Sequence, residues 1–162
     1  MHPLVVAQLL ILLTLANGSP VVAKLVLGKH FAIPLDIDTK FIDGKPLLGG
    51  SKTIRGLLIA IVVTAAGAPL VGLDFTIGLL AGAAAMAGDL LSSFVKRRLG
   101  FPASSRATGL DQIPESLLPV LACRQALSLT AVDMLAVCAI FFVGEVLLSR
   151  LLFRLRVREK PY

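Results

Sequence analysis

The feature that most constrains this chain is a series of long apolar runs that are almost free of charge. The run from Leu57 to Leu73 has no charged residue, and neither has the run from Phe75 to Ala87. Runs of this length and character are typical of helices that cross a membrane. An ordinary soluble domain is about 25% charged, whereas this chain is 16% charged and 56% hydrophobic. The sequence therefore predicts a membrane protein that crosses the bilayer several times.

We predict an all-α, polytopic membrane protein that forms a single domain over residues 1–162. About five transmembrane helices are expected, and their predicted ranges are 3–27, 56–73, 75–97, 112–126 and 130–153. Loops at 28–55 and 98–111 connect them. In the third span Gly78 and Gly82 form a small-xxx-small pair, which predicts close packing against a neighbouring helix. Thr130 and Asp133 have the spacing of a capping box that opens the last helix.

A turn-like cluster, Asn17-Gly18-Ser19-Pro20, interrupts the first span. Proline removes a backbone donor, so the cluster predicts either a kink or a short unwound stretch. An unwound stretch at membrane depth would line a cavity or a site, whereas a kink would only pack against a neighbouring helix. Both interpretations stay open at this point.

The distribution of basic residues predicts an orientation. With five spans, both long loops and the C-terminal tail share one side, and that side holds every Lys and Arg except Lys24 and Arg124. Positive charge accumulates on the cytoplasmic side of a membrane protein. We therefore expect a multi-pass protein of the cell membrane, with the N-terminus outside and the C-terminus in the cytoplasm. Because the basic residues lie in such loops, the net charge of +6 does not predict nucleic-acid binding.

The stretch Gly88–Arg98 ends the third span with an unusual polar face. On a helix, Asp89, Ser92, Ser93 and Lys96 fall on one side. Asp89 lies roughly 10 Å inside the helix end, at 1.5 Å per residue. A carboxylate at that depth is costly unless it is paired or faces water, so it predicts a functional site. The alternative is a structural ion pair with Lys96 or Arg97.

Two further polar clusters belong to the same side of the predicted membrane. The stretch Gly49–Gly56 precedes the second span, and its Lys52, Thr53 and Arg55 could donate to phosphate oxygens. The alternative is that these are ordinary basic residues at a helix end. The stretch 109–115 adds the carboxylates of Asp111 and Glu115. Carboxylates from different helices suit Mg²⁺, which completes its coordination with substrate phosphates. This chemistry predicts phosphoryl or nucleotidyl transfer. The loops of the active site are expected to face the cytoplasm.

Together these stretches, GGSKTIRG, GDLLSSFVKRR and GLDQIPESLLP, resemble the motifs of archaeal CDP-archaeol synthases, which are distant relatives of the bacterial CDP-diacylglycerol synthases. Asn17 and Pro20, and also Asp43-Gly44, match the same pattern. The resemblance implies an enzyme that transfers CMP from CTP to an unsaturated archaetidic acid, the bis-geranylgeranyl ether of glycerol phosphate. It implies Mg²⁺ as cofactor and pyrophosphate as the second product.

The resemblance also implies roles for individual residues. Asp89 and Asp111 would be the metal ligands, and together with Lys96 they would be catalytic. Substrate binding is expected of Lys52, Thr53, Arg55, Arg97, Ser92, Gln112 and Asn17. Expected partners are CTP, the prenylated lipid and the bilayer, and a homodimer is one oligomeric state left open. The competing functions are a small transporter or ion channel, in which charged residues on broken helices mark a pathway, and an assembly protein that uses the small residues of the third span.

Overall fold

The computed structural model describes residues 1–37, 39–105 and 107–154. Within these ranges the regular structure is helical, and the only β-type pairings are two isolated bridges. The helices are α1 (Pro3–Leu27), α2 (Ile54–Gly67), the short 3₁₀ helix η1 (Pro69–Val71), α3 (Phe75–Arg98), α4 (Gln112–Cys123) and α5 (Ala131–Arg154). The predicted all-α fold is confirmed. The basic tail after Arg154, which entered the orientation argument, lies outside the described residues.

Four helical segments in the described part of the chain are long and apolar enough to cross a membrane. They are α1, α2 together with η1, α3 and α5 up to Ser149. The fourth predicted span, 112–126, corresponds to α4, which has 12 residues. At 1.5 Å per residue that is roughly 18 Å, less than the hydrocarbon thickness of about 30 Å. The helix ends early because a turn begins after Cys123, in which Ser128 takes a positive φ of 51°.

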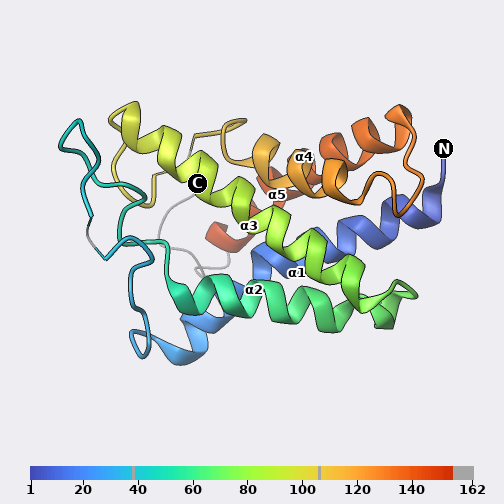
Figure 1. Ribbon diagram of the computed structural model, residues 1–162, viewed down its shortest axis with the longest axis horizontal. Helices are drawn as coiled ribbons and strands as arrows, with labels where there is room; N and C mark the ends of the chain where they lie inside the picture. Colours follow the sequence, from blue (N-terminus) through green and yellow to red (C-terminus); the bar gives the residue numbers. More distant parts are fainter. Residues whose placement is uncertain (38, 106, 155–162) are drawn as a thin grey trace.

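The five named α-helices alternate in direction along the long axis of the molecule (Figure 1). The N-terminus, the α2–α3 turn and the α4–α5 turn lie together at one end, and the loops 28–53 and 99–111 lie together at the other. A hydrogen bond of 2.7 Å from the Gln8 side chain to the carbonyl of Val71 ties α1 to the α2–α3 turn. The predicted grouping of the two long loops is therefore present, while the side of the membrane that they face stays a prediction.

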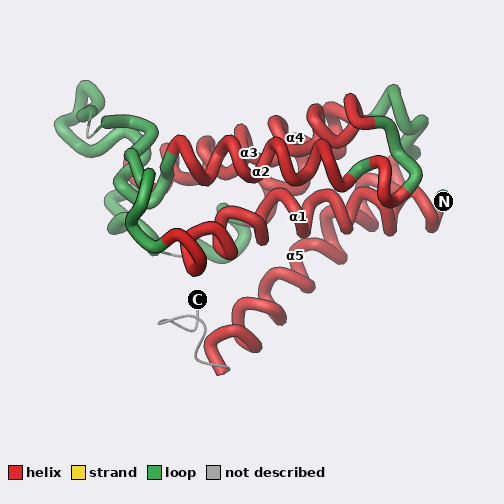
Figure 2. Tube along the Cα trace, turned by 90° about the horizontal axis from the view of Figure 1, so that it is seen from below, coloured by secondary structure: helices red, strands yellow, loops and turns green. Residues whose placement is uncertain are grey.

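Helix α3 lies at the centre of the packing, against α2 on one side and α4 on the other, and α1 contacts α2, α3 and α5. Seen from below, α5 extends away from the rest of the bundle along much of its length (Figure 2). The small residues of α3 explain its central place. A Cβ added to Gly78 would lie 2.6 Å from the Cβ of Ala68, and one added to Gly82 would lie 3.1 Å from that of Thr64. The predicted close approach through Gly78 and Gly82 is therefore made with α2.

Helix α1 is continuous from Pro3 to Leu27, with Pro20 inside it. The unwound stretch considered for 17–20 is therefore not formed. Pro20 instead packs near the start of α2, where a Cβ added to Gly56 would lie 3.6 Å from the Cβ of Pro20.

The predicted capping box at the start of α5 is confirmed. The amide of Asp133 donates to the Thr130 hydroxyl at 3.2 Å, and the amide of Thr130 donates to the Asp133 carboxylate at 3.1 Å. The same carboxylate accepts a bond of 2.7 Å from the amide of His2. The cap therefore also fixes the beginning of α1 at the end of the molecule opposite the long loops.

Candidate active site

The centre of the candidate site is an ion pair between Lys52 and Asp89. Lys52 comes from the glycine-rich loop before α2, and Asp89 comes from α3. The Lys52 Nζ lies 2.5 Å from both carboxylate oxygens of Asp89. Each side chain keeps 21% of its surface exposed, so the pair is sheltered but can be reached by a ligand. The structural alternative for Asp89, a pair with Lys96 or Arg97, is not what the structure contains, because its ionic partner is Lys52.

A second carboxylate lies beside Asp89. Glu115, in the first turn of α4, is 6% exposed. Its side chain is within hydrogen-bonding reach of Asp89, with Lys52 and Glu145 also close enough to affect its charge. Asp89 comes from α3, Glu115 from α4 and Glu145 from α5. The sequence analysis identified Glu115 as an additional carboxylate, but only the packing of α4 on α3 places it next to Asp89.

The glycine before Asp89 explains how α4 comes so close. A Cβ added to Gly88 would lie 2.2 Å from the carbonyl oxygen of Pro114 and 2.8 Å from the amide nitrogen of Glu115. No other residue type fits there without moving one of the helices. Gly88 thus allows the approach of α4 that places Asp89 next to Glu115. The Gly88-Asp89 pair is visible in the sequence.

Asp111 belongs to a separate ion pair. Its Oδ1 lies 2.6 Å from the Nζ of Lys96, and the two side chains are 13% and 9% exposed. Lys96 also donates to the carbonyl of Ser105 at 3.0 Å, and Asp111 accepts from the amide of Ala107 at 2.9 Å. The neighbouring Gln112 is fully buried and accepts from the amide of Gly109 at 2.7 Å. These contacts fold the 99–111 loop back along the last turns of α3.

Arg97 joins the two long loops to each other. It is 4% exposed, and its guanidinium donates to the carbonyl of Pro102 at 2.8 Å and to that of Leu48 at 3.4 Å. Pro102 belongs to the second loop and Leu48 to the first. Lys96, expected to be catalytic, and Arg97, expected to bind substrate, therefore hold the loops in place in this structure.

The remaining predicted substrate-binding residues make local contacts. The Thr53 hydroxyl caps α2 by accepting from the amide of Gly56 at 3.1 Å. Arg55 donates to the carbonyls of Gly28, at 3.2 Å, and His30 after the end of α1. Asn17 donates to the carbonyl of Leu13 in its own helix at 3.2 Å, and the Ser92 hydroxyl donates to the carbonyl of Asp89 at 2.9 Å. Ser92 therefore makes a local bond to the backbone of α3, one turn after Asp89.

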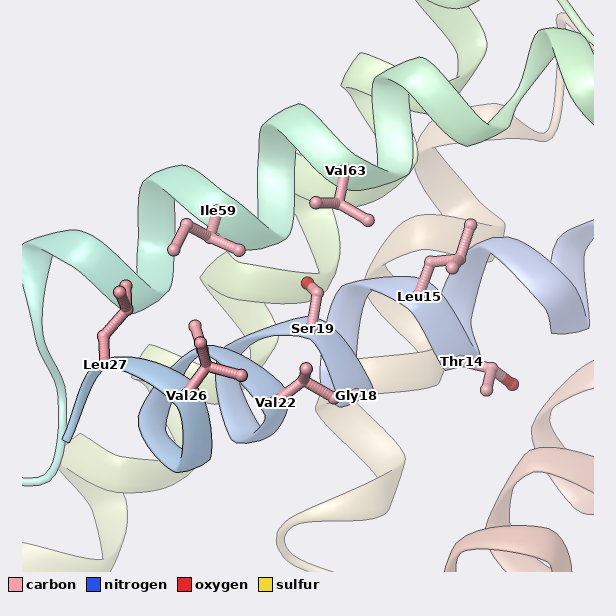
Figure 3. Close-up of a pocket in the computed structure, with 10 residues that line it drawn as sticks. Thr14, Leu15, Gly18, Ser19, Val22, Val26, Leu27, Ile59 and Val63 are labelled. Atoms are coloured by element: carbon pink, nitrogen blue, oxygen red, sulfur yellow. The ribbon is translucent and has the colours of Figure 1, made fainter.

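An apolar cavity of about 580 Å³ lies between α1 and α2. Its lining consists of Thr14, Leu15, Gly18, Ser19, Val22, Ala23, Val26, Leu27, Ile59 and Val63. Leu15 and Ser19 point from α1 toward α2, while Ile59 and Val63 point from α2 toward α1 (Figure 3). The cavity reaches the beginning of α2, and Lys52 lies just before that helix. Its lining residues all lie on α1 and α2 and include none of Lys52, Asp89 or Glu115.

Comparison with known proteins agrees with this arrangement. A family model described as CarS-like, CDP-archaeol synthase, matches residues 63–162. The CDP-archaeol synthase of Sulfurisphaera tokodaii is 34% identical over 153 residues, which cover 91% of this chain and 89% of the relative. That of Saccharolobus islandicus is 30% identical over 158 residues, with the same coverage of both chains.

A solved structure also matches. It is described as an intramembrane enzyme for archaeal membrane lipids biosynthesis, and it superimposes on this chain with a TM-score of 0.69 at 30% identity. The match covers 84% of this chain and 89% of the solved one. The overall helical arrangement is therefore that of an enzyme embedded in the membrane.

Proposed function

The chain belongs to the CDP-archaeol synthase family, and on that premise we propose that it transfers a cytidylyl group from CTP to the phosphate of an archaeal membrane lipid, releasing pyrophosphate. The lipid substrate that we propose is the unsaturated archaetidic acid with two geranylgeranyl chains. The observation that supports this assignment best is the Lys52–Asp89 pair, because it holds the ammonium of the glycine-rich loop against a carboxylate of α3.

The apolar cavity between α1 and α2 supports a lipid as the second substrate. Its lining is almost entirely hydrocarbon, and its volume of about 580 Å³ is that of a ligand pocket. A prenyl chain in this cavity would leave its glycerol phosphate at the loop end, near Lys52. We propose that CTP enters from the cytoplasm through the loops, while the lipid enters sideways from the bilayer.

The donor atoms at the site fit Mg²⁺. Asp89 offers hard carboxylate oxygens, with Glu115 beside it, and both Asp89 oxygens contact the Lys52 ammonium, which a metal ion would have to displace. Asp111 supplies a further carboxylate from the second loop. Mg²⁺ needs only one or two protein carboxylates when phosphates complete its coordination. We propose Asp89 and Asp111 as its ligands, with Glu115 as an additional candidate; when bound, the ion would neutralise triphosphate charge.

The reaction needs no covalent intermediate with the protein. An oxygen of the lipid phosphate attacks the α-phosphorus of CTP, and the bond from that phosphorus to the pyrophosphate oxygen breaks. Both substrates are anionic, so positive charge must offset their repulsion. Lys52, whose side chain is 21% exposed, can contact a phosphate directly. Lys96 and Arg97 are buried against loop carbonyls, and we propose that they contribute through position and electrostatic field.

The decisive experiment uses purified protein in bilayer nanodiscs with CTP, Mg²⁺ and the geranylgeranyl lipid phosphate. We expect equal amounts of pyrophosphate and CDP-lipid. Asp89→Asn should remove both products while the protein keeps its thermal unfolding transition. Activity retained in Asp89→Asn would overturn its role, and solute uptake without any CTP requirement would instead indicate a transporter.

The metal is tested without relying on turnover. If Asp89 helps to bind Mg²⁺, added Mg²⁺ should raise the unfolding temperature of the CTP-bound protein, because a ligand of the native state stabilises it. The shift should be smaller in Asp89→Asn. An identical shift in both proteins would remove Asp89 from the ligand set.

A further inference from the structure

We propose that Asp36, in the first loop, is a positioning residue that holds the glycine-rich loop in the shape that receives the CTP phosphates, an inference that rests on the proposed function. Asp36 is 6% exposed although it lies in a polar loop outside the helices. Its Oδ2 accepts two backbone hydrogen bonds, from the amide of Leu48 at 2.9 Å and from that of Gly49 at 2.8 Å. Both donors stand directly before the Gly50–Lys52 segment.

The segment around Asp36 is itself fastened to the far end of the same loop. The amide of Leu35 donates to the carbonyl of Lys52 at 2.7 Å, and the amide of Ile54 donates to the carbonyl of Ile33 at 3.0 Å. Residues 33–36 therefore contact both ends of the segment 48–54. The Asp36 carboxylate accepts from the amides at its beginning, and backbone hydrogen bonds hold its end. Lys52 lies between these two sets of contacts, which limit how far it can move from Asp89.

Gly49 is clamped from the opposite side as well. Its φ of +88° belongs to the left-handed region that glycine tolerates. A Cβ at Gly49 would lie 3.0 Å from the Arg97 guanidinium and 3.3 Å from the Cβ of Ala103. Arg97 also donates to the carbonyl of Leu48. The glycine-rich loop is thus held between Asp36 and Arg97, which belong to different parts of the chain.

This arrangement has a consequence for substrate binding. A glycine-rich loop without such contacts samples many conformations, and CTP would have to order it at a cost in binding free energy. With Asp36 in place, that ordering is complete before CTP arrives. The Asp36 carboxylate would therefore act on the affinity for CTP and much less on the chemical step.

Substitutions at Asp36 test this directly, because both amides share one oxygen. Asp36→Ala removes the acceptor, and we expect the KM for CTP to rise roughly tenfold to a hundredfold, with kcat within about threefold of the wild type. Asp36→Asn keeps one side-chain oxygen that can accept both amides, so its KM should rise much less than that of Asp36→Ala. If Asp36→Ala fails to fold, Asp36→Ser, whose shorter side chain is still polar, takes its place.

A matched control separates this role from general loosening of the loop. Asp43 lies in the same loop, accepts the amide of Lys45 at 3.1 Å and pairs with Arg98 at 2.8 Å, but it makes neither bond to Leu48 or Gly49. Asp43→Ala should leave the KM for CTP within about twofold of the wild type. An equal rise in both alanine variants, an unchanged KM in Asp36→Ala, or a loss confined to kcat would each overturn the proposal.

A second readout does not depend on catalysis. Hydrogen–deuterium exchange in a peptide that spans 47–53 should be faster in Asp36→Ala than in Asp36→Asn, with no substrate present, because the two amides lose their acceptor. Equal exchange in the two variants would count against the clamp. If the wild type released no pyrophosphate, the proposed function would fail while this exchange result stood.

Discussion

The backbone of Gly88 on α3 lies against the backbone of Pro114 on α4, so closely that a Cβ on Gly88 would come within 2.2 Å of the Pro114 carbonyl oxygen. This contact fixes the level at which α4 begins. Gly88 is ten positions before Arg98, where α3 ends, so Pro114, the third residue of α4, lies roughly 15 Å from that end along α3, at 1.5 Å per residue. The 99–111 loop must fold back along α3 to reach it. Asp89 and Glu115 become neighbours as a result.

Gly88→Ala tests this contact. Alanine normally favours a helix over glycine by about 1 kcal/mol, but here the added methyl would force α3 and α4 apart, and overpacking of this kind costs about 1–3 kcal/mol. We expect a lower unfolding temperature and a large loss of cytidylyl transfer. Gly144→Ala is the matched control, because a Cβ at that helical glycine meets nothing within 4 Å. Equal stability of the two variants would contradict the contact.

Filling the apolar cavity should affect one substrate only. Val63→Trp places a large side chain between α1 and α2. If the cavity holds the prenyl chains as proposed, we expect a rise of at least roughly tenfold in the KM for the lipid, with the KM for CTP unchanged. Val62→Trp is the control, because Val62 is 63% exposed on the outer side of α2. Steady-state kinetics with each substrate varied in turn distinguishes the two effects. A parallel rise in both KM values would argue against a lipid cavity.

The Lys96–Asp111 pair should contribute to stability far more than an exposed pair. Its side chains are 9% and 13% exposed, so Lys96→Met would leave a sheltered carboxylate without its cation, at a cost on the order of 3 kcal/mol. The double variant Lys96→Met, Asp111→Asn should regain part of that loss. The Arg98–Asp43 pair, whose side chains are 19% and 37% exposed, gives a more exposed comparison, since Asp43→Ala should cost about 1 kcal/mol or less. Thermal unfolding in one detergent measures all of these variants.

The capping box of α5 offers a change remote from the candidate site. Thr130→Ala removes the acceptor of the Asp133 amide and should cost about 1 kcal/mol. Because this cap lies at the end of the bundle opposite the long loops (Figure 1), kcat and both KM values should stay at their wild-type values. Thr76→Ala, at an exposed position in the first turn of α3, should leave the unfolding temperature unchanged. An effect of Thr130→Ala on CTP affinity would show that the two ends are coupled.

Much of the fold could be predicted because it depends on patterns local in the sequence. Apolar runs without charge require helices in a membrane, since only a helix satisfies its own backbone there. The capping box of Thr130 and Asp133 and the close packing at Gly78 and Gly82 were predicted in the same way. The fourth span was predicted too long, because hydropathy does not register the turn that ends α4 at Cys123.

The candidate site divides differently between sequence and structure. The sequence alone determined which residue types are available, namely the carboxylates, the basic residues and the glycines of three short motifs, and it placed their loops together through the alternation of spans. Tertiary structure decided how they pair. Lys52 meets Asp89, Lys96 meets Asp111, and Arg97 joins the two loops. The physical reason is that an ion pair forms where backbones bring charges within a few ångströms, and contacts such as that of Gly88 with Pro114, distant in sequence, set those positions.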